Sequence, residues 1–198
     1  MTVPPTIEPP ETLLDEAAIA DTVARLAAEI TADHPDGVVL VGVLKGASIF
    51  LADLARAIRD VDVAVAFIAI SRYAPDSGRV RILHDVDLDL TGRDVVLVED
   101  LVDTGLTLGY LVKHLEGQGP RRVDVCALLD RRARRILPVT VRYVGMEIPD
   151  VFVLGYGQHL ADLYRNVPCV VEADRDLLAV DPGAYVDALY ARATAGEA

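Results

Sequence analysis

The stretch VVLVEDLVDTGLT, residues 95–107, decides the fold of this chain. Its first four residues form an uninterrupted apolar run, as found in strands that are buried on both faces of a parallel sheet. The run ends in two acids, Glu99 and Asp100, and a helix is expected from about Leu106 to Leu115. Gly105 lies just before that helix, where a glycine lets the backbone turn tightly. The stretch therefore predicts a strand, a turn and the start of a helix.

The same alternation of apolar runs and helical patterns continues on both sides of this stretch. Four further runs are interpreted as strands, and they cover residues 37–44, 63–70, 123–129 and 141–146. Helices are expected over residues 14–30, 47–58 and 181 to about 192. The last of them has Asp181 as its expected N-cap and Pro182 at its first position. Residues 71–82 mix charge, proline and glycine as exposed loops do. Strands that alternate with helices predict an α/β domain with a largely parallel sheet.

The length and composition limit what the chain can be. Its 198 residues suffice for one well-buried core and are few for two independent domains. We therefore expect a single domain over residues 1–198, with a loose N-terminus over 1–12 and a C-terminal extension with a helix over 173–198. No apolar run approaches the ~20 residues that cross a bilayer, and the start lacks the pattern of a signal peptide. We therefore expect no membrane partner. Cys126 and Cys169 show no metal-binding spacing, so we expect reduced thiols in a cytoplasmic protein.

The net charge of −12 bears on the partners of the protein. A nucleic acid would require a basic surface, so we expect no nucleic-acid partner. The charge is compatible with an anionic small molecule, because a few backbone N–H groups, one arginine or a Mg²⁺ ion set the local field.

Residues 99–107 carry the chemistry needed to bind a sugar phosphate. In open α/β sheets, ligands bind outside the carboxyl ends of the strands. Adjacent carboxylates such as Glu99 and Asp100 suit sugar hydroxyls or a Mg²⁺ ion. The N–H groups of a helix start hold a phosphate, and Thr104 and Thr107 add hydroxyl donors. Together these features describe a receptor for ribose 5-phosphate. For each feature alone, the alternative is an ordinary strand end followed by a capped helix.

The ordered string of residues 95–107 resembles the diphosphoribosyl-binding motif of type I phosphoribosyltransferases. From roughly Leu14 to Val171, the chain is similar to the hypoxanthine-guanine phosphoribosyltransferase family. The resemblance implies the type I phosphoribosyltransferase fold, a mostly parallel twisted sheet flanked by helices, with a small hood built from N- and C-terminal segments. It also implies that the diphosphoribosyl group is bound by Glu99, Asp100, Asp103, Thr104, Gly105, Leu106 and Thr107.

The resemblance extends to a pyrophosphate site. Leu44, Lys45 and Gly46 match the pyrophosphate loop of the family, which implies a cis peptide bond between Leu44 and Lys45. Arg165 corresponds to an arginine that reaches pyrophosphate. Taken alone, a lysine after a strand is usually a surface residue, and Arg165 would be read as a solvated helix residue. Both assignments therefore depend on the longer match.

The resemblance also implies roles toward the purine. Asp103 occupies the acid/base position of the family, close to N7 of the base, where a well-placed carboxylate typically contributes a rate factor of ~10²–10⁴. The alternative for Asp103 is a helix N-cap. Residues 148–157 match as well, and there Phe152 is expected to stack on the base while the backbone of Val153 reads its Watson–Crick edge.

Three departures from the family fall in the site. Arg131 stands where the family has a lysine that contacts the 6-oxo group of the purine, and an arginine fork is longer and planar. Its alternative explanation is drift in an arginine-rich chain. His159 replaces an aspartate that helps to hold a second Mg²⁺ ion, although imidazole suits that cation poorly, and its alternative is a surface histidine. The closing loop, with Arg72 and Tyr73 as its candidate residues, is a few residues shorter than usual and has Arg72 in place of a serine.

The sequence therefore predicts an enzyme that transfers the 5-phosphoribosyl group from 5-phosphoribosyl 1-diphosphate to hypoxanthine or guanine, giving IMP or GMP and pyrophosphate. Mg²⁺ is the expected cofactor, held in part by Glu99 and Asp100, directly or through the sugar or water. Two alternatives stay open: a related transferase with a different acceptor base, and a non-catalytic nucleotide-sensing regulator of the same fold. By resemblance, the protein is expected to form a homodimer or homotetramer.

Overall fold

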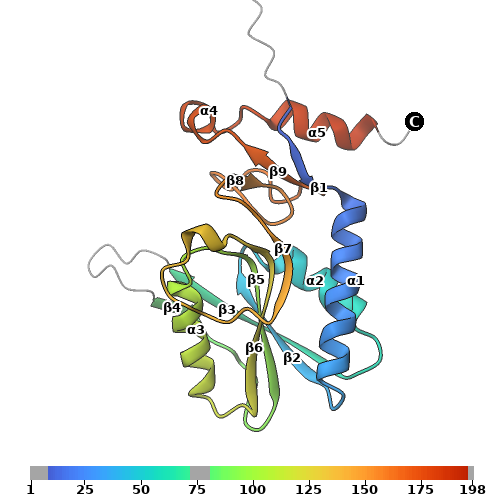
Figure 1. Ribbon diagram of the computed structural model, residues 1–198, viewed down its shortest axis with the longest axis vertical. Helices are drawn as coiled ribbons and strands as arrows, with labels where there is room; N and C mark the ends of the chain where they lie inside the picture. Colours follow the sequence, from blue (N-terminus) through green and yellow to red (C-terminus); the bar gives the residue numbers. More distant parts are fainter. Residues whose placement is uncertain (1–8, 72–80, 196–198) are drawn as a thin grey trace, which may run out of the picture. The chain divides into compact units, whose positions relative to one another are not determined.

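The computed structural model describes residues 9–71 and 81–195 of the chain, with side chains up to Tyr190. The chain divides into two compact units. The larger unit spans Ala20–Asp150 (Figure 1). The smaller unit combines the N-terminal segment up to Ile19 with the C-terminal segment from Val151. It is thus built from both ends of the chain, as the resemblance implies for the hood.

A six-stranded sheet forms the centre of the larger unit (Figure 1). In sheet order, the strands are β4 (Arg81–His84), β3 (Val63–Ser71), β2 (Val38–Leu44), β5 (Asp94–Val102), β6 (Arg122–Asp130) and β7 (Tyr143–Glu147). Every neighbouring pair is parallel except β3 and β4, which are antiparallel. The predicted α/β fold with a mostly parallel sheet is confirmed. The loop prediction is wrong where it overlaps β4, because that segment pairs with β3 instead.

Helices cover both faces of this sheet. On one face, α3 (Leu106–Glu116) shares a core cluster with alternate residues of β2 such as Val41. On the other face, α2 (Ser48–Ala57) packs on β2, where Gly42 leaves room for the side chain of Leu51. Successive side chains of a strand point to opposite faces, so a strand covered on both sides must be apolar throughout. This explains why the strand predictions from uninterrupted apolar runs succeeded.

The start of the chain differs from the prediction. Leu14 was expected in the first helix, but it belongs to a strand, β1 (Thr12–Leu14), and α1 (Glu16–Asp33) begins two residues later. Within the segment expected to be loose, the carbonyl of Glu11 accepts a hydrogen bond of 2.8 Å from the backbone N–H of Glu172. Leu14 continues the apolar spacing of α1 into the strand, so the pattern alone did not separate the two elements.

The prediction for the last helix is wrong at its start. Asp181 is the C-cap residue of a separate short helix, α4 (Arg175–Val180), and its carboxylate accepts a hydrogen bond from the N–H of Gly183. The last helix, α5 (Val186–Ala195), begins only after that turn. A helix of six residues is too short to show a clear helical period, which is why α4 was missed.

The smaller unit contains a three-stranded antiparallel sheet in the order β1, β9 (Val170–Ala173) and β8 (Phe152–Leu154). Its buried core joins this sheet to α4 and α5 through Leu154, Tyr164, Val167, Val171, Ala173, Leu178, Tyr185 and Leu189. None of the helices in the described part of the chain is long and apolar enough to cross a membrane.

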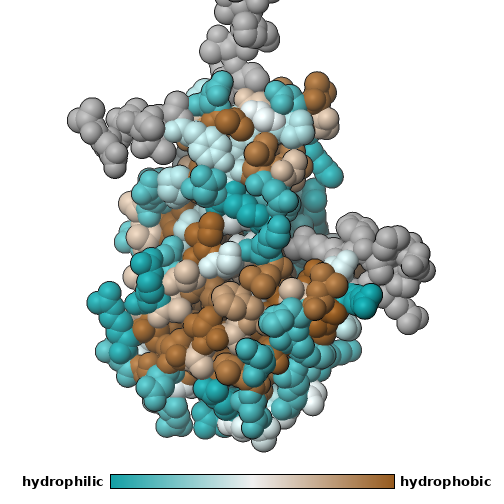
Figure 2. Space-filling view, turned by 180° about the vertical axis from the view of Figure 1, so that it is seen from behind, coloured by the Kyte–Doolittle hydropathy of each residue, from teal (hydrophilic) through white to brown (hydrophobic). Residues whose placement is uncertain are grey.

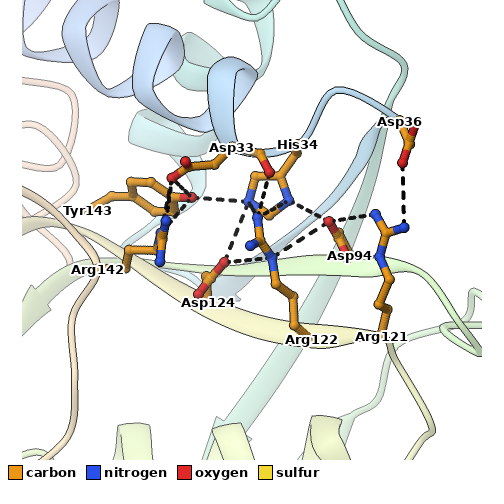
Figure 3. Close-up of polar contacts among 9 residues, drawn as sticks. All are labelled: Asp33, His34, Asp36, Asp94, Arg121, Arg122, Asp124, Arg142 and Tyr143. Carbon is orange, nitrogen blue, oxygen red and sulfur yellow. Dashed lines mark hydrogen bonds and ion pairs between the residues drawn. The ribbon is translucent and has the colours of Figure 1, made fainter.

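Charged and polar side chains from the amino ends of β5, β6 and β7 and from the end of α1 gather in a group that we call the amino-edge cluster (Figure 3). Its members are Asp33, His34, Asp36, Asp94, Arg121, Arg122, Asp124, Arg142 and Tyr143. His34 is fully buried, and its ring nitrogens lie 2.9 Å from Asp94 Oδ2 and 3.1 Å from the Tyr143 hydroxyl. Hydrogen bonds of 2.6 and 2.9 Å from Arg121 lower the pKa of Asp94 to about 2. The cluster ties the end of α1 to the strands that follow.

Candidate active site

The parallel register of the sheet brings the predicted site residues of the larger unit to one edge. β5 lies between β2 and β6, and all three run in the same direction. Lys45 follows the end of β2, Asp103 follows the end of β5, and Arg131 follows the end of β6. Val102 is in register with Asp130, so the residues after them leave the sheet side by side. We call this region the active-site edge.

The acidic pair and the predicted pyrophosphate loop form one structural unit. Glu99 and Asp100 are 4% and 7% exposed at the end of β5. Gly46 lies directly against the carboxylate of Asp100, and a β-carbon at Gly46 would collide with Asp100 Oδ2. The peptide bond between Leu44 and Lys45 is cis, as the resemblance implies. A glycine at position 46 is therefore required by the close approach of two motifs that lie far apart in the sequence.

The turn after β5 matches the predicted phosphate-binding segment in its backbone. Gly105 has a φ of +79°, and it is the N-cap of α3, with no side chain capping the helix. The alternative interpretation of Asp103 as the helix N-cap is therefore wrong. The hydroxyl of Thr104 accepts a long hydrogen bond of 3.4 Å from the N–H of Leu106, and its carbonyl accepts from the chain at residues 136–137. Backbone N–H groups of an uncapped first turn are suited to an anion, because they have no partner within the helix.

Arg131 contacts Asp103 directly. Its Nη1 donates a hydrogen bond of 2.7 Å to Asp103 Oδ1. The Arg131 side chain is only 3% exposed, whereas that of Asp103 is 38% exposed. The Nε of Arg131 is buried and has no hydrogen-bond partner among the described residues. The buried guanidinium thus lies behind a carboxylate that remains accessible.

Sequence reasoning missed two residues that hold this pair in place. Arg135 donates from Nε to the backbone carbonyl of Asp103 at 3.0 Å, and its guanidinium also pairs with Asp130. Asp130 is a buried carboxylate at the last position of β6, and Arg132 also pairs with it at 3.3 Å. The sequence signal was an acid followed by several arginines, but spacing alone did not tell which of them point inward.

In the smaller unit, β8 holds the residues expected to contact the base. Val153 is buried and Phe152 is half-buried. After β8, the segment from residue 155 to 164 has left-handed backbone at Gly155, Tyr156, Gly157, Ala161, Asp162 and Tyr164. Arg165 donates from Nη1 to the carbonyl of Gly157 at 2.6 Å, and its Nη2 lies 3.6 Å from Asp162 Oδ1. Arg165 thus holds together a tightly wound loop and is not the solvated helix residue of the alternative interpretation.

His159 is an exposed residue of that loop. Its Nδ1 accepts a hydrogen bond of 3.2 Å from the backbone N–H of Asp162. This bond connects the ring to the backbone of the loop, and a role of His159 toward Mg²⁺ stays a prediction. Arg72 and Tyr73, the candidate residues of the closing loop, lie outside the described residues.

Glu99 and Asp100 fit the expected Mg²⁺ ion by their chemistry. Carboxylate oxygens are the hard ligands that this cation prefers. Within residues 9–71 and 81–195, no group of three or more His, Cys, Asp or Glu side chains is arranged to hold a metal ion. Mg²⁺ commonly takes one or two carboxylates together with the phosphates of a substrate, so it needs no larger group of protein ligands.

Comparison with known proteins identifies the class and then the family. The family model described as phosphoribosyl transferase domain matches residues 10–159, which places the chain in that class of transferases. The hypoxanthine-guanine phosphoribosyltransferase of Dictyostelium discoideum is 37% identical over 169 residues, which cover 82% of this chain and 94% of the relative. The enzyme of that name from Bacillus subtilis is 39% identical over 162 residues, covering 80% of this chain and 89% of the relative.

A solved structure agrees with these relatives. The crystal structure of a hypoxanthine-guanine phosphoribosyltransferase from Bacillus anthracis superposes with a TM-score of 0.80 at 39% identity, covering 84% of this chain and 100% of the other. The chain therefore belongs to the hypoxanthine-guanine phosphoribosyltransferase family of type I phosphoribosyltransferases.

Proposed function

We propose that this protein transfers the 5-phosphoribosyl group from 5-phosphoribosyl 1-diphosphate to a 6-oxopurine, hypoxanthine or guanine, and releases IMP or GMP and pyrophosphate. The observation that carries the proposal is the active-site edge. There a buried acidic pair lies against a glycine loop, and an uncapped helix start lies beside a carboxylate held by a buried arginine. These are the parts that a diphosphorylated sugar and an acceptor base require.

For the donor, the proposal assigns each chemical group of the sugar to a matching protein group. The N–H groups and hydroxyls of residues 103–107 bind the 5-phosphate, and Glu99 and Asp100 bind the ribose hydroxyls. Leu44, Lys45, Gly46 and Arg165 bind the pyrophosphate. Mg²⁺, held by Glu99 and Asp100 in part through the sugar or water, would neutralise charge on the departing pyrophosphate.

For the acceptor, Arg131 supports a 6-oxopurine. A guanidinium has five N–H donors and no acceptor, so it matches a 6-oxo group and opposes a 6-amino group. Asp103 is the proposed acid/base residue, which exchanges a proton with the base as the bond to the sugar forms. Phe152 would stack on the base, and the backbone of Val153 would read its Watson–Crick edge. Arg72 and Tyr73 remain the proposed closing residues, which would keep water from the reacting carbon.

A coupled assay with each purine tests the proposal. We expect nucleotide from hypoxanthine and guanine, and a kcat/KM for adenine at least about 100-fold lower, because a donor-only site leaves the 6-amino group unpaired. Removal of Mg²⁺ with EDTA should abolish turnover, and excess Mg²⁺ should restore it. If no nucleotide forms from hypoxanthine, guanine or xanthine, the proposal is wrong.

We further propose that the protein acts in the cytoplasm as a homodimer or homotetramer. Cys126 is a buried free thiol, which is compatible with a reducing compartment. Figure 2 shows apolar residues gathered on one face, and Val65 of β3 is an exposed apolar residue of the larger unit. Light scattering coupled to size-exclusion chromatography tests the assembly. A wild-type protein that elutes at the mass of one chain at micromolar concentration contradicts it.

A further inference from the structure

The ion pair between Arg131 and Asp103 rests on a rigid backbone frame. Asp103 directly follows β5 and Arg131 directly follows β6, and these strands are parallel neighbours with Val102 in register with Asp130. The backbone N–H of Arg131 also donates to the carbonyl of Val102 at 2.9 Å. Both side chains therefore start from neighbouring positions at the active-site edge, next to the hydrogen bond between Arg131 and Val102.

A second arginine secures the backbone of Asp103. The Nε of Arg135 donates to the carbonyl oxygen of Asp103 at 3.0 Å, while its guanidinium pairs with the buried carboxylate of Asp130. Asp103 is thus held twice, at its side chain by Arg131 and at its main chain by Arg135. An acid/base group must be held in the correct geometry to act, because small misplacements of reacting groups cost large rate factors.

The guanidinium of Arg131 has capacity beyond this pair. Nη1 is engaged with Asp103 Oδ1 at 2.7 Å, but the buried Nε has no hydrogen-bond partner in the described part of the chain. Buried donors are nearly always paired in proteins, and exceptions often mark a position where a ligand or water completes the bonding. The site therefore contains a buried cation that binds Asp103 with one nitrogen and has another donor without a protein acceptor.

We propose that Arg131 is a positioning residue, which holds the carboxylate of Asp103 in place for proton exchange while its remaining donors bind the acceptor atoms of the same purine. The inference rests on the proposed function and assigns Arg131 a second task within it. Asp103 and the base are then connected through one rigid planar group. The base is aligned with the residue that exchanges its proton, and the guanidinium acts only as a donor of hydrogen bonds.

Arginine suits this double task better than lysine. Its planar fork directs several donors in fixed directions, so it can bind two partners at once with defined geometry. An ammonium group on a lysine is a compact charge on a flexible stem, which can donate to a 6-oxo group but does not fix a neighbouring carboxylate as firmly. Replacing Arg131 by lysine therefore separates the positioning of Asp103 from the binding of the purine.

The first experiment is steady-state kinetics of Arg131→Lys with hypoxanthine and saturating diphosphate donor. We expect kcat to fall by about 10- to 100-fold, because part of the contribution of a positioned acid/base group is lost. The KM for hypoxanthine should stay within about threefold, because the ammonium still donates to the 6-oxo group. A rise in KM with an unchanged kcat would show that Arg131 only binds the base, and would overturn the inference.

Arg132→Lys is the matched control. Arg132 is the next residue and also pairs with carboxylates, at 3.3 Å with Asp130 and 3.4 Å with Glu147, but its side chain is 63% exposed. We expect both kcat and KM of this variant to equal those of the wild type. A loss of kcat similar to that of Arg131→Lys would mean that the whole arginine segment matters only for folding, and would also overturn the inference.

A double-mutant cycle with Asp103→Asn and Arg131→Gln measures whether the two residues act as a unit. If they do, the double variant has a kcat within about threefold of the slower single variant, since the second change removes nothing further. If the two losses multiply, the residues act independently and the inference fails. Circular dichroism of all three variants confirms that each is folded.

The cycle also separates this inference from the proposed function. If the wild type forms no nucleotide from any 6-oxopurine, the proposed function fails. The double-mutant cycle is then evaluated from the melting temperatures of the ligand-free wild type and variants. Non-additive shifts, with a coupling of about 2–4 °C, would support a paired unit of Asp103 and Arg131. Additive shifts would overturn the pairing on which the inference depends.

Discussion

The two edges of the central sheet use charged residues in opposite ways. In the amino-edge cluster, carboxylates and guanidinium groups face one another: Arg142 lies 2.8 Å from Asp33, Arg121 lies 2.6 Å from Asp94, and Arg122 lies 3.0 Å from Asp124 (Figure 3). At the active-site edge, the buried Arg131 has only part of its donors engaged by Asp103, and α3 begins without a side-chain cap. The charged groups of one edge form ion pairs with one another, whereas the other edge has an accessible carboxylate and an uncapped helix start.

This difference follows from the direction of the chain. In a parallel α/β sheet, the helix after each strand begins at the carboxyl edge, so its N–H groups and the positive end of its dipole lie there. The helix before each strand ends at the amino edge, where backbone carbonyls lie. At that edge Arg122 donates to the carbonyl of Asp33, the last residue of α1. Arginines at the amino edge therefore stabilise the fold, whereas the carboxyl edge is suited to binding anions.

The largest effect is expected from removing a charge at the amino edge. Asp94→Ala should lower the free energy of unfolding by about 3–5 kcal/mol, because it leaves His34 and Arg121 facing an emptied buried position. The kcat of the protein that remains folded should not change, since the cluster lies at the edge opposite to the site. Urea denaturation and steady-state kinetics measure the two quantities. Asp36→Ala is the control, because Asp36 is exposed and its pair with Arg121 is long, at 3.5 Å.

A loss below about 1 kcal/mol in Asp94→Ala would contradict a stabilising role for the amino-edge cluster. A large fall in kcat at unchanged stability would contradict the division of roles between the two edges.

An intermediate effect is expected from a methyl group at the active-site edge. Gly46→Ala should lower kcat/KM by about 100-fold, or about 2.7 kcal/mol, because the new β-carbon displaces the carboxylate of Asp100 and with it the bound sugar. Gly183→Ala is the matched control, because the nearest atom to its new β-carbon is 3.4 Å away in a turn of the smaller unit. Activity of Gly46→Ala near that of the wild type would show that the contact with Asp100 does not position substrate.

The smallest effect concerns the pH dependence of stability. Hydrogen bonds from Arg121 hold the folded pKa of Asp94 at about 2, below its ordinary value of 3.8. The stabilisation is therefore complete above pH 3.8 and is lost as the pH falls toward 2, in total about 2 kcal/mol. We expect the difference in unfolding free energy between the wild type and Asp94→Asn to shrink by that amount between pH 5 and pH 2. A difference that stays constant over this range would show that Asp94 is not the group that titrates.

The sequence predicted every strand of the central sheet except β4. Uninterrupted apolar runs identify β2, β5 and β6 because each is buried on both faces, and the role of residues 99–107 in binding a sugar phosphate stays a prediction. The small antiparallel sheet of the smaller unit was not predicted as such. Its strands have only three or four residues, and two of them, β1 and β9, pair across more than 150 residues of chain.

The amino-edge cluster was missed for a similar reason. Asp33, His34, Asp94, Arg122 and Tyr143 come from four separate elements or their ends, and none of them belongs to a recognisable local pattern. Each taken alone is typical of a residue at the boundary between an element and a loop. Only the parallel register, which aligns the amino ends of β5, β6 and β7, brings these charges within hydrogen-bonding distance.

By itself, the sequence determined the local chemistry of this protein: which segments become buried strands, where the chain turns, and which residue types are available to bind a phosphorylated sugar. These properties depend on residues close together in the chain, so spacing and composition reveal them. The tertiary structure alone decided that Gly46 meets Asp100 and that Arg131 binds the carboxylate of Asp103. These contacts join the ends of different strands, and their partners are set by sheet register, which no local pattern encodes.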